Sequence, residues 1–115
     1  MAYDDNLAER VRAQLGDTAG VTELKMFGGW GATVRGNMAV GVMGDDLIVR
    51  VGPDAYDAAL ARKGARPFDF TGRSMTGWVY VNGNALTTER ALAQWVQRGV
   101  AFATGLPPKQ PARRR

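Results

Sequence analysis

The pattern of hydrophobic and polar positions predicts a helix near each end of the chain, with short strands between them. At the amino-terminal end, Leu7, Val11 and Leu15 recur at four-residue spacing, which predicts an amphipathic helix over Asp4 to Leu15. Gly16 follows the last of these residues and is expected to end the helix, since glycine readily adopts the conformation that terminates helices.

A longer helix is predicted from about Thr88 to Thr104, with Thr87 as its N-cap. Its apolar stripe of helical period consists of Leu92, Trp95, Val96, Gly99, Phe102 and Ala103. Glycine inside a helix costs about 1 kcal/mol relative to alanine. We therefore expect a close approach between Gly99 and another backbone, because such packing would offset that cost.

Short apolar runs between these helices predict strands. The predicted strands are Thr22 to Phe27, Ala32 to Arg35, Met38 to Met43, Leu47 to Val51, Pro67 to Phe70 and Gly77 to Asn82. Gly36 and Asn37 separate two of these runs and predict a tight hairpin, because both residues tolerate positive φ. Within the fourth run, Leu47, Val49 and Val51 are expected to share one face of the sheet.

A third helix is predicted over Ala55 to Lys63, since Pro53 suits a helix start and Gly64 suits a helix end. The resulting order is α-β-β-β-β-α-β-β-α. Short hairpin connections favour antiparallel pairing. We therefore expect an α+β two-layer sandwich, with an antiparallel sheet of about five to six strands and three helices. Residues 1–106 form the predicted domain, and residues 107–115 a Pro/Arg-rich tail.

The basic character of the chain is concentrated in that tail. The 115 residues carry a formal net charge of +4. The basic residues of the tail are Lys109, Arg113, Arg114 and Arg115. The other 11 basic residues equal the 11 acidic residues in number, so residues 1–108 are formally neutral. A basic, nucleic-acid-binding surface is therefore not indicated for the domain itself.

Composition also excludes several classes of protein. The chain has no cysteine, which excludes disulfides, a CxxC redox pair and cysteine zinc sites. Its first residues have neither a basic start nor an apolar stretch of signal-peptide length. No apolar run approaches the ~20 residues that a membrane-spanning helix needs. We expect a cytoplasmic protein without a membrane or metal partner.

Five segments share their order and spacing with a known family. They are Lys25 to Gly29, Gly36 to Val42, Asp46 to Pro53, Arg66 to Phe68 and Gly77 to Val81. Together they resemble the TfoX N-terminal domain family over roughly residues 3–106. The resemblance implies a two-layer α+β domain with an antiparallel sheet. Full-length TfoX/Sxy proteins are linked to regulation of natural competence and carry a second, helical domain. The family supplies no catalytic residues to transfer.

The segment Phe27-Gly28-Gly29-Trp30-Gly31 is the first candidate interaction site. Its glycines would let a partner approach the backbone closely. An exposed Trp30 would stack on a base or fill a pocket on a partner. The alternative is a strand-to-strand turn with Trp30 packed on the core. A phosphate-binding loop is not indicated, because no Gly-Lys-Ser/Thr follows.

Trp78 and Tyr80 form the second candidate interaction site, since both lie on the same face of one predicted strand. Basic residues from other strands, namely Lys25, Arg35 or Arg50, would be interleaved with them, as in proteins that bind single-stranded nucleic acid. The alternative is that these aromatic residues are half-buried members of a sheet, where aromatic residues are favoured in any case.

The sequence shows no catalytic constellation. Asp45 and Asp46 are adjacent carboxylates, and adjacent side chains in a turn usually diverge, so we interpret both as turn residues. Ser74 is the sole serine, and the chain has no histidine to activate it. We expect no catalytic residue, no cofactor and no metal site.

The tail, with Lys109 and Arg113 to Arg115, is a candidate nucleic-acid site. Four phosphate contacts would give weak and salt-sensitive binding. The alternative is a disordered end that increases solubility.

These observations together predict a small regulatory or protein-interaction domain without enzymatic activity, binding a protein partner or a second copy of itself. The alternative is a nucleic-acid-binding module that uses the basic tail and exposed aromatic residues.

Overall fold

The computed structural model describes residues 3–26, 28–69 and 75–108. Its elements in chain order are α1 (Asp5–Leu15), β1 (Val21–Met26), β2 (Gly29–Val34), β3 (Asn37–Met43), β4 (Asp46–Arg50), α2 (Tyr56–Leu60), β5 (Ala65–Pro67), β6 (Trp78–Val81), the 3-10 helix η1 (Gly83–Ala85) and α3 (Glu89–Gly105). The predicted order of helices and strands is confirmed, with η1 added before α3. Ser74 lies outside the described residues.

The strands form one antiparallel sheet in the order β1-β2-β3-β4-β6-β5. Directly opposite residues in an antiparallel sheet share a face, and successive residues alternate between faces. Leu47 stands opposite Val81, and Val49 opposite Val79. All four side chains are fully buried, which confirms the predicted inward face of β4 and β6.

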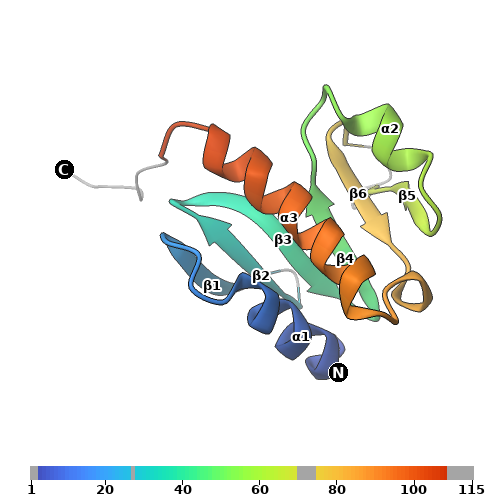
Figure 1. The fold of residues 1–115 in the computed structure, drawn as a ribbon, viewed down its shortest axis with the longest axis horizontal. Helices are drawn as coiled ribbons and strands as arrows, with labels where there is room; N and C mark the ends of the chain where they lie inside the picture. The colour runs from blue at the N-terminus through green and yellow to red at the C-terminus, as the bar shows by residue number, and fades with distance from the viewer. Residues whose placement is uncertain (1–2, 27, 70–74, 109–115) are drawn as a thin grey trace.

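The helices cover one side of this sheet (Figure 1), where α3 crosses the middle with α1 and α2 on either side of it. The predicted stripe of α1 and most of that of α3 face the sheet and join its inward residues in one core. The exception is Phe102, which is only half-buried, while Val100 is buried in its place. The main contributors are Leu7, Val11, Leu15, Val40, Val42, Leu47, Val49, Val79, Val81, Leu92, Trp95 and Val96. Ala59 connects α2 to the same core. The two-layer α+β sandwich is therefore confirmed.

The hairpin between β2 and β3 differs by one residue from the prediction. Val34 pairs with Asn37, so the turn residues are Arg35 and Gly36, with φ angles of +53° and +84°. Positive φ at both central positions is the geometry of a type I′ turn. Asn37 belongs to β3 because it pairs with Val34. Its buried side chain also donates a hydrogen bond from Nδ2 to the Pro107 carbonyl, at 2.9 Å.

Several other element boundaries also differ from the predictions. The N-cap of α3 is Thr88, not Thr87, because the Thr88 hydroxyl accepts a hydrogen bond from the backbone N–H of Ala91 at 3.1 Å. Helix α2 is shorter than predicted, and β5 begins and ends earlier than the predicted strand. Phe68 lies just beyond β5 and is nevertheless 95% buried, which explains why its apolar character suggested a strand there.

The close approach expected at Gly99 is confirmed. A Cβ atom at this position would lie 2.4 Å from the carbonyl oxygen of Ala39 and 2.8 Å from a methyl group of Val40. Any side chain at residue 99 would therefore push α3 away from β3.

Candidate functional site

The sheet face opposite the helices carries one continuous row of residues that crosses all six strands. Register places Leu24, Gly31, Gly41, Ile48, Tyr80 and Arg66 side by side in that order. Arg50 and Trp78 form the next pair on this face, two residues along β4 and β6. We call these eight residues the helix-free face. Ile48 is 99% buried and yet does not belong to the core under the helices, which shows that this side of the sheet has packing of its own.

Two arginines of the helix-free face stack on its aromatic residues. The Arg50 guanidinium carbon lies 5.2 Å from the centre of the Trp78 ring, and that of Arg66 lies 4.4 Å from the centre of the Tyr80 ring. Arg50 also lies 5.3 Å from the centre of the Phe102 ring, so it reaches the end of α3 at the margin of this face. Such cation–π contacts contribute roughly 0.5–1 kcal/mol when exposed and about 2 when desolvated. Phe68 lies against both rings, with centroid distances of 6.0 Å to Trp78 and 4.9 Å to Tyr80.

Tyr80 acts here as a neutral hydrogen-bond donor. Its hydroxyl donates to the sulfur of Met43 at 3.6 Å. Burial is the main cause that raises the pKa of Tyr80 above its ordinary value, against a smaller opposing effect of the Arg66 charge. The phenol consequently stays protonated at neutral pH and is suited to binding, not to removing a proton from a substrate.

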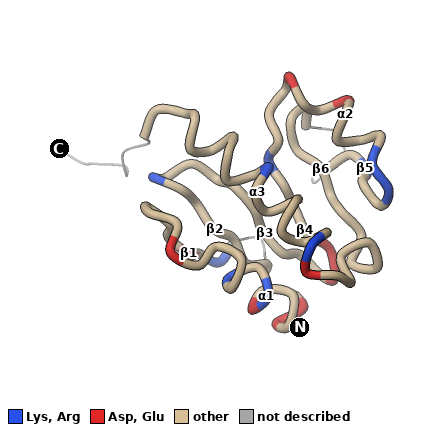
Figure 2. The backbone as a smooth tube through the Cα atoms, viewed as in Figure 1, with Lys and Arg blue, Asp and Glu red and all other residues tan. Residues whose placement is uncertain are grey.

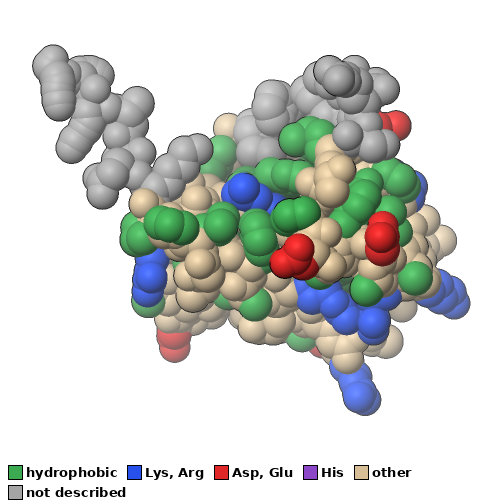
Figure 3. All heavy atoms as spheres, turned by 90° about the horizontal axis from the view of Figure 1, so that it is seen from above, with side chains coloured by type: hydrophobic (Ala, Val, Ile, Leu, Met, Phe, Trp, Pro, Cys, Tyr) green, Lys and Arg blue, Asp and Glu red, His purple; other side chains and the backbone are tan. Residues whose placement is uncertain are grey.

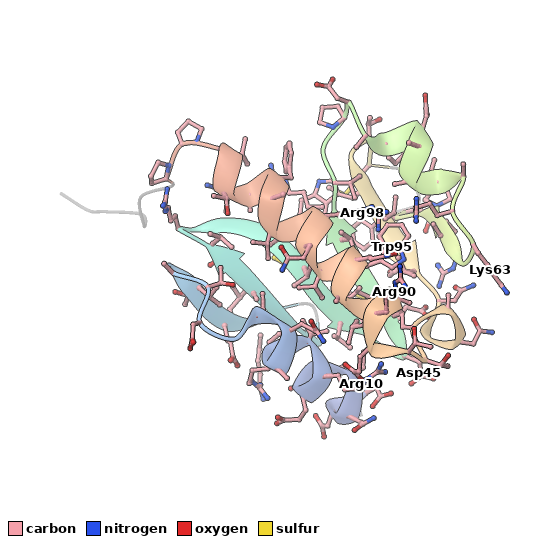
Figure 4. All side chains as sticks on the ribbon, in the orientation of Figure 1. Arg10, Asp45, Lys63, Arg90, Trp95 and Arg98 are labelled. Atoms are coloured by element: carbon pink, nitrogen blue, oxygen red, sulfur yellow. The ribbon has the colours of Figure 1, made fainter. Side chains whose placement is uncertain are left out.

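Arg66 is held in place by polar contacts at the end of the sheet. It donates to the Asp46 carboxylate and, from Nε, to Asn82 Oδ1 at 3.0 Å. Asp46 also accepts a hydrogen bond from the Gly83 backbone N–H at 3.3 Å. The backbone of Asp46 pairs with Met43, so Asp46 is the first residue of β4, which corrects its interpretation as a turn residue. Asp45, labelled in Figure 4, stays in the turn and is exposed.

The structure places Trp30 in the core. Its side chain is 98% buried in β2, and its indole Nε1 donates to Glu23 Oε1 at 3.1 Å. Arg12 of α1 covers the ring at 5.4 Å and donates two hydrogen bonds to the same carboxylate, at 2.8 and 2.9 Å. The structure therefore agrees with the alternative interpretation, in which Trp30 packs on the core. The ring is covered by Arg12, and the indole N–H is bound by Glu23. A stacking role for an exposed Trp30 is incompatible with this burial.

The contacts around Trp30 also shift two pKa values. Hydrogen bonds from Arg12, and secondarily from Trp30, lower the pKa of Glu23 below its ordinary value. The Glu23 hydrogen bond is in turn the main cause that raises the pKa of Arg12. Acidic and basic positions are mixed along α1 and β1 (Figure 2), so opposite charges there neutralise each other.

The remaining sequence candidates are dispersed. Lys25 pairs with Trp30 across β1 and β2, so it is exposed on the helix-bearing side, away from Arg50. Gly28 is exposed with a φ of +76°, whereas Gly29 is buried in β2. Arg35 lies in the exposed β2–β3 turn. Phe27 lies outside the described residues, as do the tail residues Lys109 and 113–115, so the nucleic-acid role of the tail stays a prediction.

The structure therefore brings together Arg50, Trp78 and Tyr80 from the predicted set. It adds Arg66 and Leu24, which sequence reasoning missed. Strand alternation was the available signal for Leu24, which stands one residue before Lys25 and is 36% exposed. For Arg66 the available signal was its position directly before the apolar residues Pro67 and Phe68. No sequence pattern indicated that Arg66 pairs with Asp46.

Within the described part of the chain, no group of three or more acidic side chains is arranged to hold a metal ion. In the same part, no helix has both the length and the apolar character needed to cross a bilayer.

Comparison with known proteins identifies one family. The family model of the TfoX N-terminal domain matches residues 13–103, which run from the end of α1 through most of α3 and include every residue of the helix-free face. No curated protein matches the chain, and no solved structure does.

Proposed function

The chain belongs to the TfoX N-terminal domain family, and from that premise we propose that it is a small, non-enzymatic regulatory domain that binds a partner protein through its helix-free face. The observation that carries this proposal is that the exposed Leu24 and the half-buried Trp78 and Tyr80 lie on the sheet face opposite the helix layer. The residues between them in the row, Gly31, Gly41 and Ile48, are buried.

The chemistry of the helix-free face favours protein recognition. Tyr, Trp and Arg are enriched at binding hot spots, where a large flat side chain gains contact area at a low cost in conformational entropy. Trp78 and Tyr80 are half-buried, so each ring is fixed by its neighbours and still has an accessible surface. Leu24 at the far end of the row adds an exposed aliphatic contact.

Charge favours a different protein over a second copy of this chain. Arg66 is paired with Asp46, but no ion pair among the described residues includes Arg50. A symmetric dimer with its two-fold axis near Arg50 would bring two copies of this arginine close together, and like charges across an interface are unfavourable. A partner with acidic side chains near an apolar patch would instead gain attraction.

We propose that the protein is not an enzyme, because its polar side chains lack the residue types and the free carboxylates that catalysis commonly uses. The sequence has no histidine or cysteine, which are the commonest general base and thiol nucleophile. Three carboxylates that could act in catalysis, Glu23, Asp46 and Glu89, are each hydrogen-bonded to an arginine. These ion pairs tie the elements together and leave the carboxylates poorly suited to accept a proton.

The test compares full-length variants by affinity capture from cells of the source organism, with light scattering of the purified chain. We expect the wild type to be monomeric and to capture a partner protein. The double variant Leu24→Glu with Arg50→Glu is expected to capture at least about tenfold less of that partner. Ala101→Glu is the matched control, because Ala101 is exposed on α3 in the opposite layer. Equal capture by all variants, or a dimer that the double variant abolishes, would contradict the proposal.

A further inference from the structure

A groove on the helix side of the molecule collects three arginines from two elements. It has a volume of about 540 Å³ and is lined by Arg62, Arg90, Ala93, Gln94, Gln97 and Arg98. Arg62 follows α2, and the other five residues belong to α3. We call this the arginine groove. It lies in the helix layer, so it shares no residue with the helix-free face.

The spacing along α3 explains why these side chains converge. Arg90, Gln94 and Arg98 are four residues apart and therefore lie on the same flank of the helix. In Figure 4 the labelled Arg90, Trp95 and Arg98 follow one another along the side of α3 that faces α2, whereas Lys63 extends away from them. Figure 3 shows basic side chains gathered at the lower right of that view, which is the helix side.

Among the described residues, none of the three arginines forms an ion pair with an acidic side chain. The ion pairs of the described residues involve Arg10, Arg12 and Arg66, and none includes Arg62, Arg90 or Arg98. In addition, Nη1 of Arg98 is buried and has no hydrogen-bond partner. Buried donors are nearly always hydrogen-bonded in proteins, and one that is charged carries a particularly high desolvation cost.

The environment of Arg98 disfavours its charge. Burial is the main cause that lowers the pKa of Arg98, and the positive charge of Arg62 lowers it further. The face of Trp95, 4.8 Å from the guanidinium carbon of Arg98, offsets part of this cost. An anion placed in the groove between Arg62 and Arg98 would counter the repulsion between these two like charges.

We propose that the arginine groove binds the phosphate group of a phosphate ester, with Arg62 and Arg98 as the principal ligands and Arg90 with Gln94 at the rim. Guanidinium groups present several N–H donors in a planar fork that matches phosphate oxygens. Three guanidinium groups and two amides supply more donors than the two oxygens of a single carboxylate can accept, which favours phosphate. This inference goes beyond the proposed protein partner and rests on different residues.

The experiment uses the full-length chain and two probes, inorganic pyrophosphate and a short oligothymidylate. Binding is measured by calorimetry and by the shift in melting temperature, against sodium chloride at matched ionic strength. We expect the double variant Arg62→Gln with Arg98→Gln to lose at least about tenfold in affinity. The exposed pair Arg62→Gln with Arg90→Gln, which does not alter the buried Nη1, is expected to weaken binding as well.

The free protein provides an independent readout. Arg62→Gln removes the repulsion with Arg98, so the melting temperature without probe is expected to stay equal or rise, while its increase with pyrophosphate shrinks. A purely structural role of Arg62 would instead lower the melting temperature of the free protein.

Two controls identify the source of the phosphate and the contribution of the tail. Arg35→Gln removes an exposed arginine of the β2–β3 turn. The triple variant Arg113→Gln with Arg114→Gln and Arg115→Gln removes charge from the tail. Both variants should bind the probes with the affinity of the wild type. Pyrophosphate binding alone would indicate a small phosphorylated ligand, and tighter oligothymidylate binding through the same arginines a nucleic-acid backbone. Failure of both probes to bind, undiminished binding in the double variant, or loss only in the tail variant would overturn the proposal.

Discussion

Two glycines of α3 show how one residue type is used for different reasons within a single helix. A Cβ atom at Gly99 would lie 2.4 Å from the Ala39 carbonyl oxygen, whereas a Cβ atom at Gly105 would meet nothing within 4 Å. We expect Gly99→Ala to lower the free energy of unfolding by about 1–3 kcal/mol, since it overpacks the contact between α3 and β3. Gly105→Ala is expected to be neutral or to stabilise by up to about 1 kcal/mol.

Urea unfolding followed by tryptophan fluorescence distinguishes these two variants. The pair is well matched because both substitutions add the same methyl group to the same helix. Equal changes in the unfolding midpoint would show that the close approach of α3 to β3 is not required for stability.

A second residue-scale prediction concerns pH. The pKa of Glu23 is lower in the folded chain than its ordinary value, so Glu23 stabilises the fold at pH values above that ordinary value. This stabilisation is lost as the pH falls through the lowered pKa, where the folded state also becomes protonated. Because the Glu23 side chain is 42% exposed, its ion pair with Arg12 should contribute only about 0–1 kcal/mol.

The measurement is the free energy of unfolding of the wild type and of Glu23→Gln, followed from neutral pH into the acid range. We expect the two curves to differ at neutral pH and to converge in acid. Asp17→Asn is the control, because Asp17 is exposed and belongs to none of the ion pairs among the described residues. Curves that run parallel over the whole range would exclude Glu23 as a source of pH dependence.

At the scale of elements, the start of α3 offers a direct test between two adjacent threonines. Thr88 caps the helix by accepting the Ala91 N–H, while Thr87 is exposed and accepts no such bond from the helix. Thr88→Ala should cost about 1 kcal/mol of stability, within the usual range for a lost N-cap. Thr87→Ala should change stability by less than about 0.5 kcal/mol. Thermal unfolding measures the stability of both variants. A larger loss of stability in Thr87→Ala than in Thr88→Ala would show that Thr88 is not the N-cap.

Comparing the predicted elements with the observed ones shows which of their features could be predicted from the sequence. The stripes of α1 and α3 were read correctly because burial against the sheet imposes a helical period on their apolar residues. The turn between β2 and β3 was displaced by one residue, because local preference favours Gly and Asn whereas tertiary contact decided the register. The bond from Asn37 to the Pro107 carbonyl comes from a segment 70 residues away, and no local pattern contains it.

At the scale of the whole molecule, the two proposed surfaces lie on opposite sides of the sheet. The helix-free face and the arginine groove have no residue in common, and substitutions at separate sites without shared partners are usually additive. Leu24→Glu with Arg50→Glu should therefore leave pyrophosphate affinity within about twofold of the wild type. Arg62→Gln with Arg98→Gln should leave partner capture unchanged. Loss of both activities in either variant would indicate a single coupled site instead of two.

The sequence by itself determined the fold class, the order of elements, the family, and the inward faces of α1, α3, β4 and β6. These features depend on the spacing of apolar residues, which is local information. Only the tertiary structure decided that Trp30 is buried beside Glu23, that Arg50 and Arg66 stack on Trp78 and Tyr80, and that Arg62 and Arg98 line the same groove. Each of these contacts joins side chains from different elements, and their partners depend on strand order and helix placement, which a single sequence does not encode in any local pattern.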